Sequence, residues 1–178
     1  GEYLYFLKPA STTPSTKVLP ELIQRLITGL RFPKTMRWDD SDLRAARPIR
    51  WLLVLLDGKP LRVTLGRLAS APATIIGGPK RPESVAITTL PAYHAALKRD
   101  GVILDQRQRR QIITRLVDSA AAQQKGVVTP EAVSYGLLDE VTHLVERPSS
   151  FTGQFDQTYL VLPREVLLAS MAKHQRIF

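Results

Sequence analysis

Cysteine is absent from this sequence of 178 residues, and methionine and tryptophan occur only twice each. Without cysteine there is no disulfide framework, no thiolate nucleophile and no cysteine-based zinc site. The sequence also lacks any run of about 18 apolar residues, the length that a membrane-spanning helix needs. The lack of disulfides is typical of a cytoplasmic protein. We therefore expect a cytoplasmic location and no membrane partner.

The first residues, Gly1 to Phe6, lack the basic region and the long apolar core of a signal peptide. The chain begins without an initiator methionine and enters an alternating aromatic and aliphatic run, which predicts a strand over residues 3–7. We interpret the chain as an excised fragment of a longer protein.

Acidic residues are scarce relative to basic ones. The 25 lysines and arginines face 16 aspartates and glutamates, giving a net charge of +9 and an isoelectric point near 10.2. Such a balance favours a polyanionic partner, of which nucleic acid is the commonest. Arginine outnumbers lysine, which suits forked contacts to phosphate. Charge alone leaves a basic but merely soluble domain as the alternative.

Apolar spacing predicts an α+β fold class, with a mixed or antiparallel sheet, a hairpin near 49–66 and a block of helices. The hairpin would join an apolar run, 49–56, through Asp57-Gly58 to an alternating return strand at 61–65. We expect a sheet-rich part, 1–90, and a helix-rich part, 91–178, in one compact unit or two subdomains.

Helical periodicity marks the remaining elements. Leucine and isoleucine spacing from Leu19 to Leu30 predicts the first helix, which Pro33 stops. Asp105 should cap a helix that reaches about Gln124. The other expected elements are a short strand at 85–87, helices at 91–99 and after Ser134, a strand or hairpin around 150–161, and a last helix from Arg164 to about Lys173.

Residues suited to catalysis or metal binding are not grouped in the sequence. His94, His143 and His174 lack the i, i+4 spacing of a helical metal site, and His143 should face solvent. The stretch Gly77–Lys80 is a weak match to a phosphate loop and is more typical of a turn. We expect no catalytic residue, no metal and no cofactor in this chain.

The strongest concentration of chemistry runs from Arg31 to Trp51, where cations alternate with both tryptophans. Guanidinium groups hold phosphates and aromatic rings stack on unpaired bases, so this segment suits an RNA surface. Trp51 should belong to the buried strand, whereas Trp38 could either close the edge of the core or stack on a base. The candidate RNA-binding residues are Lys34, Arg37, Trp38, Arg44, Arg47 and Arg50.

Four runs of the sequence, in order, resemble blocks of the β subunit of bacterial-type glycyl-tRNA synthetase. They are Gly1–Leu4, Phe32–Trp38 with Arg47–Trp51, Leu137–Pro148, and Leu162–Phe178. The chain departs from the family pattern at Gly78 and Pro79, which stand where the family usually has a His-Arg pair, and at Arg147, where tryptophan is common.

The resemblance implies a place in the N-terminal half of a subunit that recognises the tRNA for glycine, near the acceptor arm. The family's enzyme joins glycine to tRNA with ATP, in a heterotetramer of two α and two β chains whose α subunit holds the catalytic site, ATP and Mg. It also implies a likeness to the editing-like module of the phenylalanyl-tRNA synthetase β subunit. The alternatives to tRNA binding are a docking module for the α subunit and a vestigial editing-like domain.

Overall fold

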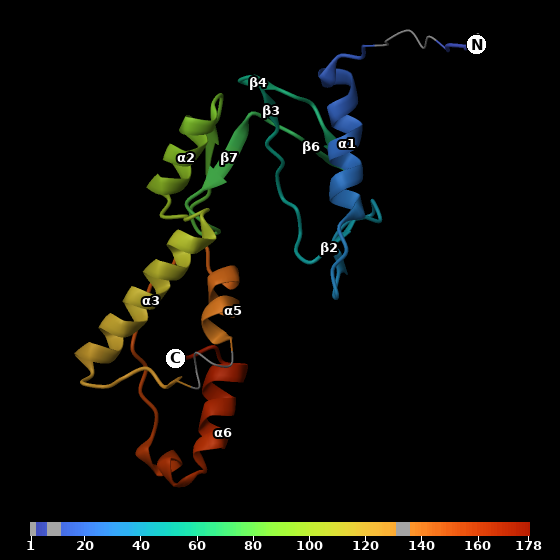
Figure 1. Ribbon diagram of the computed structural model, residues 1–178. Coiled ribbons are helices and arrows are strands. Elements are labelled where there is room, and N and C mark those ends of the chain that lie inside the picture. Colours follow the sequence, from blue (N-terminus) through green and yellow to red (C-terminus); the bar gives the residue numbers. More distant parts are fainter. Residues whose placement is uncertain (1–2, 7–11, 131–135) are drawn as a thin grey trace. The chain divides into compact units, whose positions relative to one another are not determined.

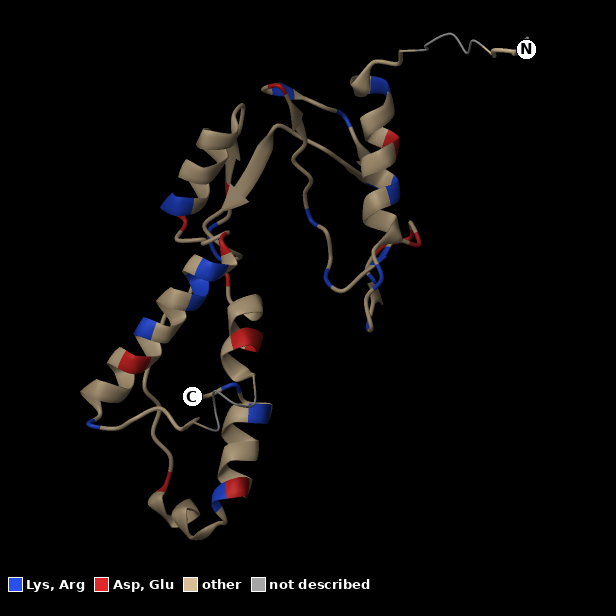
Figure 2. Cartoon of the chain, viewed as in Figure 1, with Lys and Arg blue, Asp and Glu red and all other residues tan. Residues whose placement is uncertain are grey.

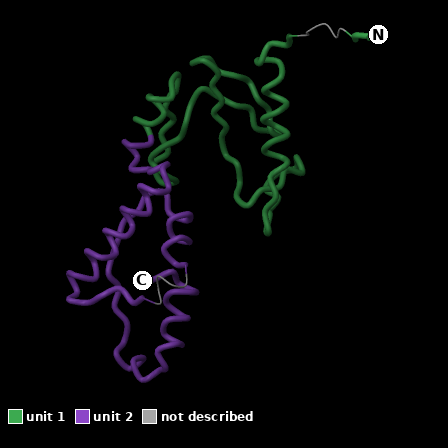
Figure 3. The backbone as a smooth tube through the Cα atoms, viewed as in Figure 1, with its two compact units in different colours: residues 1–96 green, residues 97–178 purple. Residues whose placement is uncertain are grey.

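A computed structural model describes residues 3–6, 12–130 and 136–178 (Figure 1). The chain divides into two compact units, residues 1–96 and 97–178 (Figure 3). The first unit carries every strand of the described residues, and the second is helical. Helices and small antiparallel hairpins thus make a mixed α and β fold, as the sequence predicts, although each sheet has only two strands.

Four hairpins account for the strands of the described residues. They pair β1 (Met36–Arg37) with β2 (Arg44–Ala45), β3 (Leu55–Leu56) with β4 (Lys59–Pro60), β5 (Thr64–Leu65) with β6 (Leu68–Ala69), and β7 (Ala73–Ile76) with β8 (Glu83–Ala86). The predicted turn at Asp57-Gly58 is confirmed, because both residues have positive φ, 50° and 74°, as a type I′ turn requires. The long strand predicted over 49–56 is wrong, since only its last two residues form a strand.

The core of the first unit lies on alternating residues of the segment 61–65, where the predicted return strand is wrong except for Thr64 and Leu65, which form β5. Leu61, Val63 and Leu65 are buried, while the residues between them are exposed, so the predicted alternation is confirmed. The half-buried Ser70 binds the backbone of this segment through its side chain. Its hydroxyl accepts the N–H of Val63 at 2.8 Å and donates to the carbonyl of Leu61 at 2.7 Å. The other buried residues of this unit are Leu43, Ala45, Thr74, Ile76, Ile87 and Ala96.

The first helix, α1 (Ser15–Gly29), contacts β5 and leaves part of its apolar surface uncovered. Leu19, Ile23 and Ile27 are half-buried. Val18, Leu22 and Leu26 are exposed and follow one another four residues apart, which places them in one stripe along the helix. The strand predicted at the N-terminus is wrong for residues 3–6, whose side chains are exposed, and residue 7 lies outside the described residues.

The helices that follow keep the order expected from the sequence. They are α2 (Leu90–Arg99), α3 (Gln106–Gln123), α5 (Leu137–Leu144), the 3-10 helix η1 (Gln157–Val161), α6 (Arg164–Leu168) and the π-helix η2 (Ala169–His174). The Asp105 cap is confirmed, since its carboxylate accepts the N–H of Gln108 at 2.8 Å. The strand or hairpin predicted around 150–161 is wrong, because the chain makes η1 there. The predicted cap at Ser134 lies outside the described residues.

Arginines tie the helices of the second unit together. Arg109 donates to the carbonyls of Thr142 at 2.7 Å and Ile103 at 2.6 Å, which links the start of α3 to the end of α5. Arg176 donates to Glu140 at 2.6 Å and to carbonyls at the end of η2. The same unit holds a small apolar cluster of Leu137, Ala172, Val141 and Phe178. No helix in the described ranges has the length and apolarity needed to cross a bilayer.

Candidate nucleic-acid interface

The β1–β2 hairpin brings two of the candidate RNA-binding residues together. Its register sets Arg37 directly opposite Arg44, and both are exposed. Like charges in that position repel each other, and the two arginines differ in how they are compensated. Arg37 lies 3.4 Å from Asp42 and donates to the carbonyl of Asp39 at 3.0 Å. Arg37 is therefore engaged within its own hairpin.

The turn of this hairpin holds three aspartates, and each has a partner. Asp39 accepts hydrogen bonds from Ser41, from the hydroxyl at 2.5 Å and from the N–H at 2.9 Å. Asp40 pairs with Arg67 at 2.9 Å, and Asp42 pairs with Arg37. The turn predicted over this acidic run is confirmed, and two of its three carboxylates are paired with arginines.

The Asp39 carboxylate offers a pH test of this turn. The hydrogen bonds from the Ser41 hydroxyl and N–H hold the pKa of Asp39 below its ordinary value. Because the pKa is lower in the folded state, the charged carboxylate stabilises the turn fully at pH values above the pKa of the unfolded chain. This contribution is lost as the pH falls through the pKa of the folded state. We expect Ser41→Ala to raise the pKa of Asp39, measured by carboxyl-carbon NMR titration. An unchanged pKa would show that the hydroxyl does not hold the charge.

Four of the candidate cations differ from Arg37 in their surroundings. Lys34, Arg44, Arg47 and Arg50 are exposed, and no ion pair joins them to an acid within the parts of the chain that the structure describes. Figure 2 shows basic residues along the β1–β2 hairpin and the irregular segment that follows it toward β3. Since side chains elsewhere do not neutralise them, these four can meet phosphate without breaking an internal contact.

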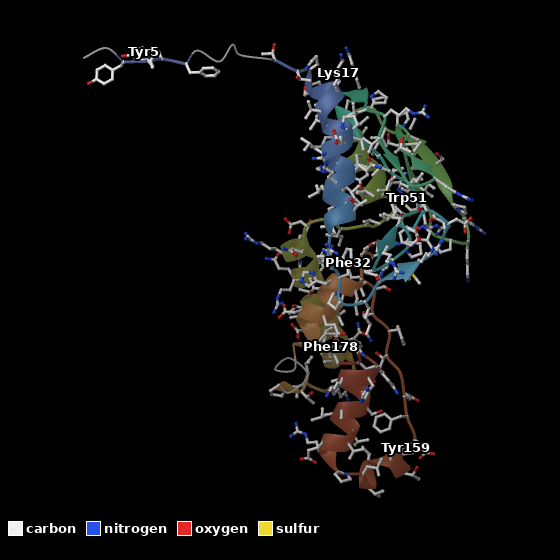
Figure 4. All side chains as sticks on the ribbon, turned by 90° about the vertical axis from the view of Figure 1, so that its right-hand side faces the viewer. Tyr5, Lys17, Phe32, Trp51, Tyr159 and Phe178 are labelled. Atoms are coloured by element: carbon white, nitrogen blue, oxygen red, sulfur yellow. The ribbon has the colours of Figure 1, made fainter. Side chains whose placement is uncertain are left out.

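Neither tryptophan is fully buried. Trp51 is 40% exposed and lies outside any strand, so the prediction that it is buried is wrong (Figure 4). Backbone pairing with another segment begins at the next residue, where the carbonyl of Leu52 accepts a hydrogen bond from the N–H of Ala71 at 2.9 Å. Trp38 is half-buried. Trp51 is thus an exposed aromatic side chain on this surface, although it is not among the candidate RNA-binding residues predicted from the sequence.

Cations in the second unit are more often committed to internal contacts. Arg110 pairs with Asp139, and Arg147 pairs with Asp100 at 3.1 Å. Arg109 and Arg176 hold backbone carbonyls, as described above. Although Arg107 and Arg115 remain exposed on α3, neither lies in a segment that carries a tryptophan. The described residues that combine exposed cations without an ion pair and a tryptophan therefore lie between Lys34 and Trp51.

Residues suited to metal binding stay apart. Among the residues that the structure describes, no three histidines, aspartates or glutamates gather in a way that could hold a metal ion. His143 is exposed on α5, as predicted. The hairpin turn between β7 and β8 begins with Gly77 and Gly78, both at positive φ, so the prediction of a turn at Gly77–Lys80 is confirmed.

Comparison with known proteins identifies the family. The family model described as glycyl-tRNA synthetase beta subunit matches residues 1–178. The glycine–tRNA ligase beta subunit of Moorella thermoacetica is 38% identical over 178 residues, and that of Citrifermentans bemidjiense is 40% identical over the same length. All of this chain is matched in both cases, but it spans only about a quarter of each relative, 25% and 26%. The chain belongs to the glycyl-tRNA synthetase β-subunit family.

Proposed function

We propose that this chain is a tRNA-binding part of the β subunit of glycyl-tRNA synthetase and that it contacts the acceptor arm of the tRNA for glycine. The observation that carries the proposal is the set of exposed cations that have no acidic partner among the described residues, Lys34, Arg44, Arg47 and Arg50. The net charge of +9 adds a longer-range attraction for a polyanion.

The proposal assigns different roles to the candidate residues. Lys34, Arg44, Arg47 and Arg50 contact the phosphate backbone, which fixes register without reading sequence. Arg37 mainly holds its own hairpin through Asp42 and the carbonyl of Asp39. Trp38, which is half-buried, supports the hairpin and contributes less to RNA.

The chemistry of the whole enzyme lies elsewhere in this proposal. Glycine, ATP and Mg would bind to the α subunit of an assembly with two α and two β chains, and the ligase reaction would occur there. This chain would take part in the reaction by holding tRNA. The proposed likeness to the editing-like module of the phenylalanyl-tRNA synthetase β subunit concerns the fold, and a solved structure of the intact subunit would test it.

A titration of labelled tRNA with the purified protein, followed by fluorescence anisotropy at several salt concentrations, tests the RNA role. Contacts to phosphate release counterions, and each contributes roughly −0.7 to −0.9 to the slope of log K against log salt. We expect binding at low salt with a slope of about −3 to −4, which corresponds to the four free cations. No binding at low salt would exclude a tRNA role for this chain.

The exposed stripe of α1 favours a second candidate function, docking of the α subunit. Val18, Leu22 and Leu26 are 39%, 50% and 67% exposed on one side of the helix. An apolar stripe of this kind is typical of a helix that meets another protein. Co-purification with the α subunit that is lost in Leu22→Glu, while affinity for tRNA is unchanged, would assign this face to docking. Both functions can reside in one chain.

A further inference from the structure

Trp51 stands out among the apolar side chains of the first unit because of where it lies in the chain. It follows Arg50 directly and Arg47 by four residues, and neither arginine has an acidic partner among the described residues. The segment forms no helix or strand until β3. A large ring that is 40% exposed beside free cations does not stabilise the core as a buried tryptophan would.

The chemistry of this group limits the ligand that it fits. An aromatic face can stack on a base only when that base is not already stacked between its neighbours in a duplex. Guanidinium groups beside the ring hold the phosphates of the same strand. An exposed tryptophan that follows free arginines in the chain is therefore suited to a single strand, whereas a duplex would use the arginines alone.

A protein partner fits the same surface less well. From Arg31 to Trp51 there are six cations and three acids, and all three acids are engaged with Ser41, Arg67 or Arg37. A partner would have to supply an anion for each free cation around the ring. A polynucleotide does so with every nucleotide, because each carries a phosphate.

We propose that Trp51 is a stacking platform that makes this surface select unpaired nucleotides over duplex RNA. The inference rests on the proposed tRNA-binding function and deepens it, because it names the part of an RNA that the surface takes. Arg47 and Arg50 hold phosphates of the bound strand, and Trp51 contributes the preference for an unpaired strand.

The experiment compares two RNA probes with the purified protein at one low salt concentration. The probes are a labelled single strand of about 12 nucleotides without internal pairing and the duplex that it forms with its complement; a strand of this length covers a typical single-strand binding site. We expect Trp51→Leu to weaken binding of the single strand about tenfold and to leave binding of the duplex unchanged. Trp51→Phe keeps an aromatic face and should retain most of the affinity.

A control variant and a fluorescence measurement test whether the effect is specific to Trp51. Phe151→Leu removes another exposed aromatic side chain, 93% exposed and outside the basic segment, and should change neither affinity. In a Trp38→Phe background Trp51 is the sole tryptophan, and we expect the single strand to quench its fluorescence more than the duplex does.

The outcomes separate this inference from the function on which it rests. If the parent protein binds neither tRNA nor the short RNA, the tRNA-binding function fails. If the parent binds both but Trp51→Leu holds the single strand equally well, only the stacking role is overturned. Loss of α-subunit co-purification in Trp51→Leu, with RNA affinity unchanged, would instead assign the ring to a protein contact and would also overturn it.

Discussion

Replacing Arg44, Arg47 and Arg50 together by alanine is expected to lower the affinity for tRNA about 100-fold at low salt. Each of these side chains is exposed and lacks an acidic partner among the described residues, so its charge is available to phosphate. The loss of three phosphate contacts should also flatten the slope of log K against log salt by about 2 to 3. Anisotropy titrations at four salt concentrations would measure both quantities.

The matched control removes the same charge from the second unit. Lys98, Arg107 and Arg115 are also exposed, and their joint replacement by alanine lowers the net charge equally. We expect that variant to lose only the smaller, long-range part of the attraction. If both triple variants lost the same affinity and the same slope, net charge alone would account for binding, and the Lys34–Trp51 surface would have no special role. Arg37→Ala should weaken binding less than Arg44→Ala, because Arg37 is already engaged with Asp42.

Gly77→Ala is expected to destabilise the first unit by about 3 kcal/mol or more. Gly77 has φ of 84° in the turn between β7 and β8, where an L side chain is strained. A β-carbon at this position would also collide with the backbone carbonyl of Arg81, which cannot move without opening the turn. Urea unfolding followed by tryptophan fluorescence reports on this unit, because both tryptophans lie in it.

Gly58→Ala separates the two causes of that loss. Gly58 has a similar φ of 74°, but its added β-carbon would meet only the carbonyl of Thr88, at an ordinary 3.5 Å. We expect this variant to lose about 1 kcal/mol, the cost of the backbone strain alone. Equal losses in the two variants would mean that the close approach to Arg81 is relieved without effect on stability.

The parts of the fold that follow from local chemistry could be predicted from the sequence. Asp105 satisfies a free N–H at the start of α3, and a short polar residue before an apolar periodic run is a sufficient signal for that. Asp57-Gly58 fixes a hairpin because both residues tolerate positive φ. The alternation of Leu61, Val63 and Leu65 likewise predicts one buried face, although only Thr64 and Leu65 of this segment form a strand.

The errors arise where long-range pairing decides the structure. The apolar run 49–56 suggested a continuous buried strand, but hydrophobicity does not show where a chain finds a partner, and pairing in β3 begins only at Leu55. Residues 3–6 alternate as a strand would, yet lie exposed and form none. The apolar residues near 150–161 turn into η1, because Asp156 caps a helical turn by accepting the N–H of Thr158 at 2.9 Å.

The sequence predicts which residues make up the candidate site, but it does not predict their ion pairs or their exposure. The basic segment was visible as a cluster of arginines, but its internal ion pair between Arg37 and Asp42 depends on the register of the hairpin. Trp51 was assigned to the core because its neighbours Leu52 to Leu56 are apolar. The available signal was Arg50, since an apolar run that begins next to a charged side chain has its first residues near solvent.

The acidic turn of the β1–β2 hairpin would give the proposed RNA contact a direction. Asp39, Asp40 and Asp42 lie at one end of the hairpin, while Arg47 and Arg50 follow its other end in the chain. A phosphate that approached the turn would meet three carboxylates, and a phosphate farther along the segment would meet free guanidinium groups. If RNA binds as proposed, its backbone would therefore lie along Arg47 and Arg50 and turn away from the three aspartates.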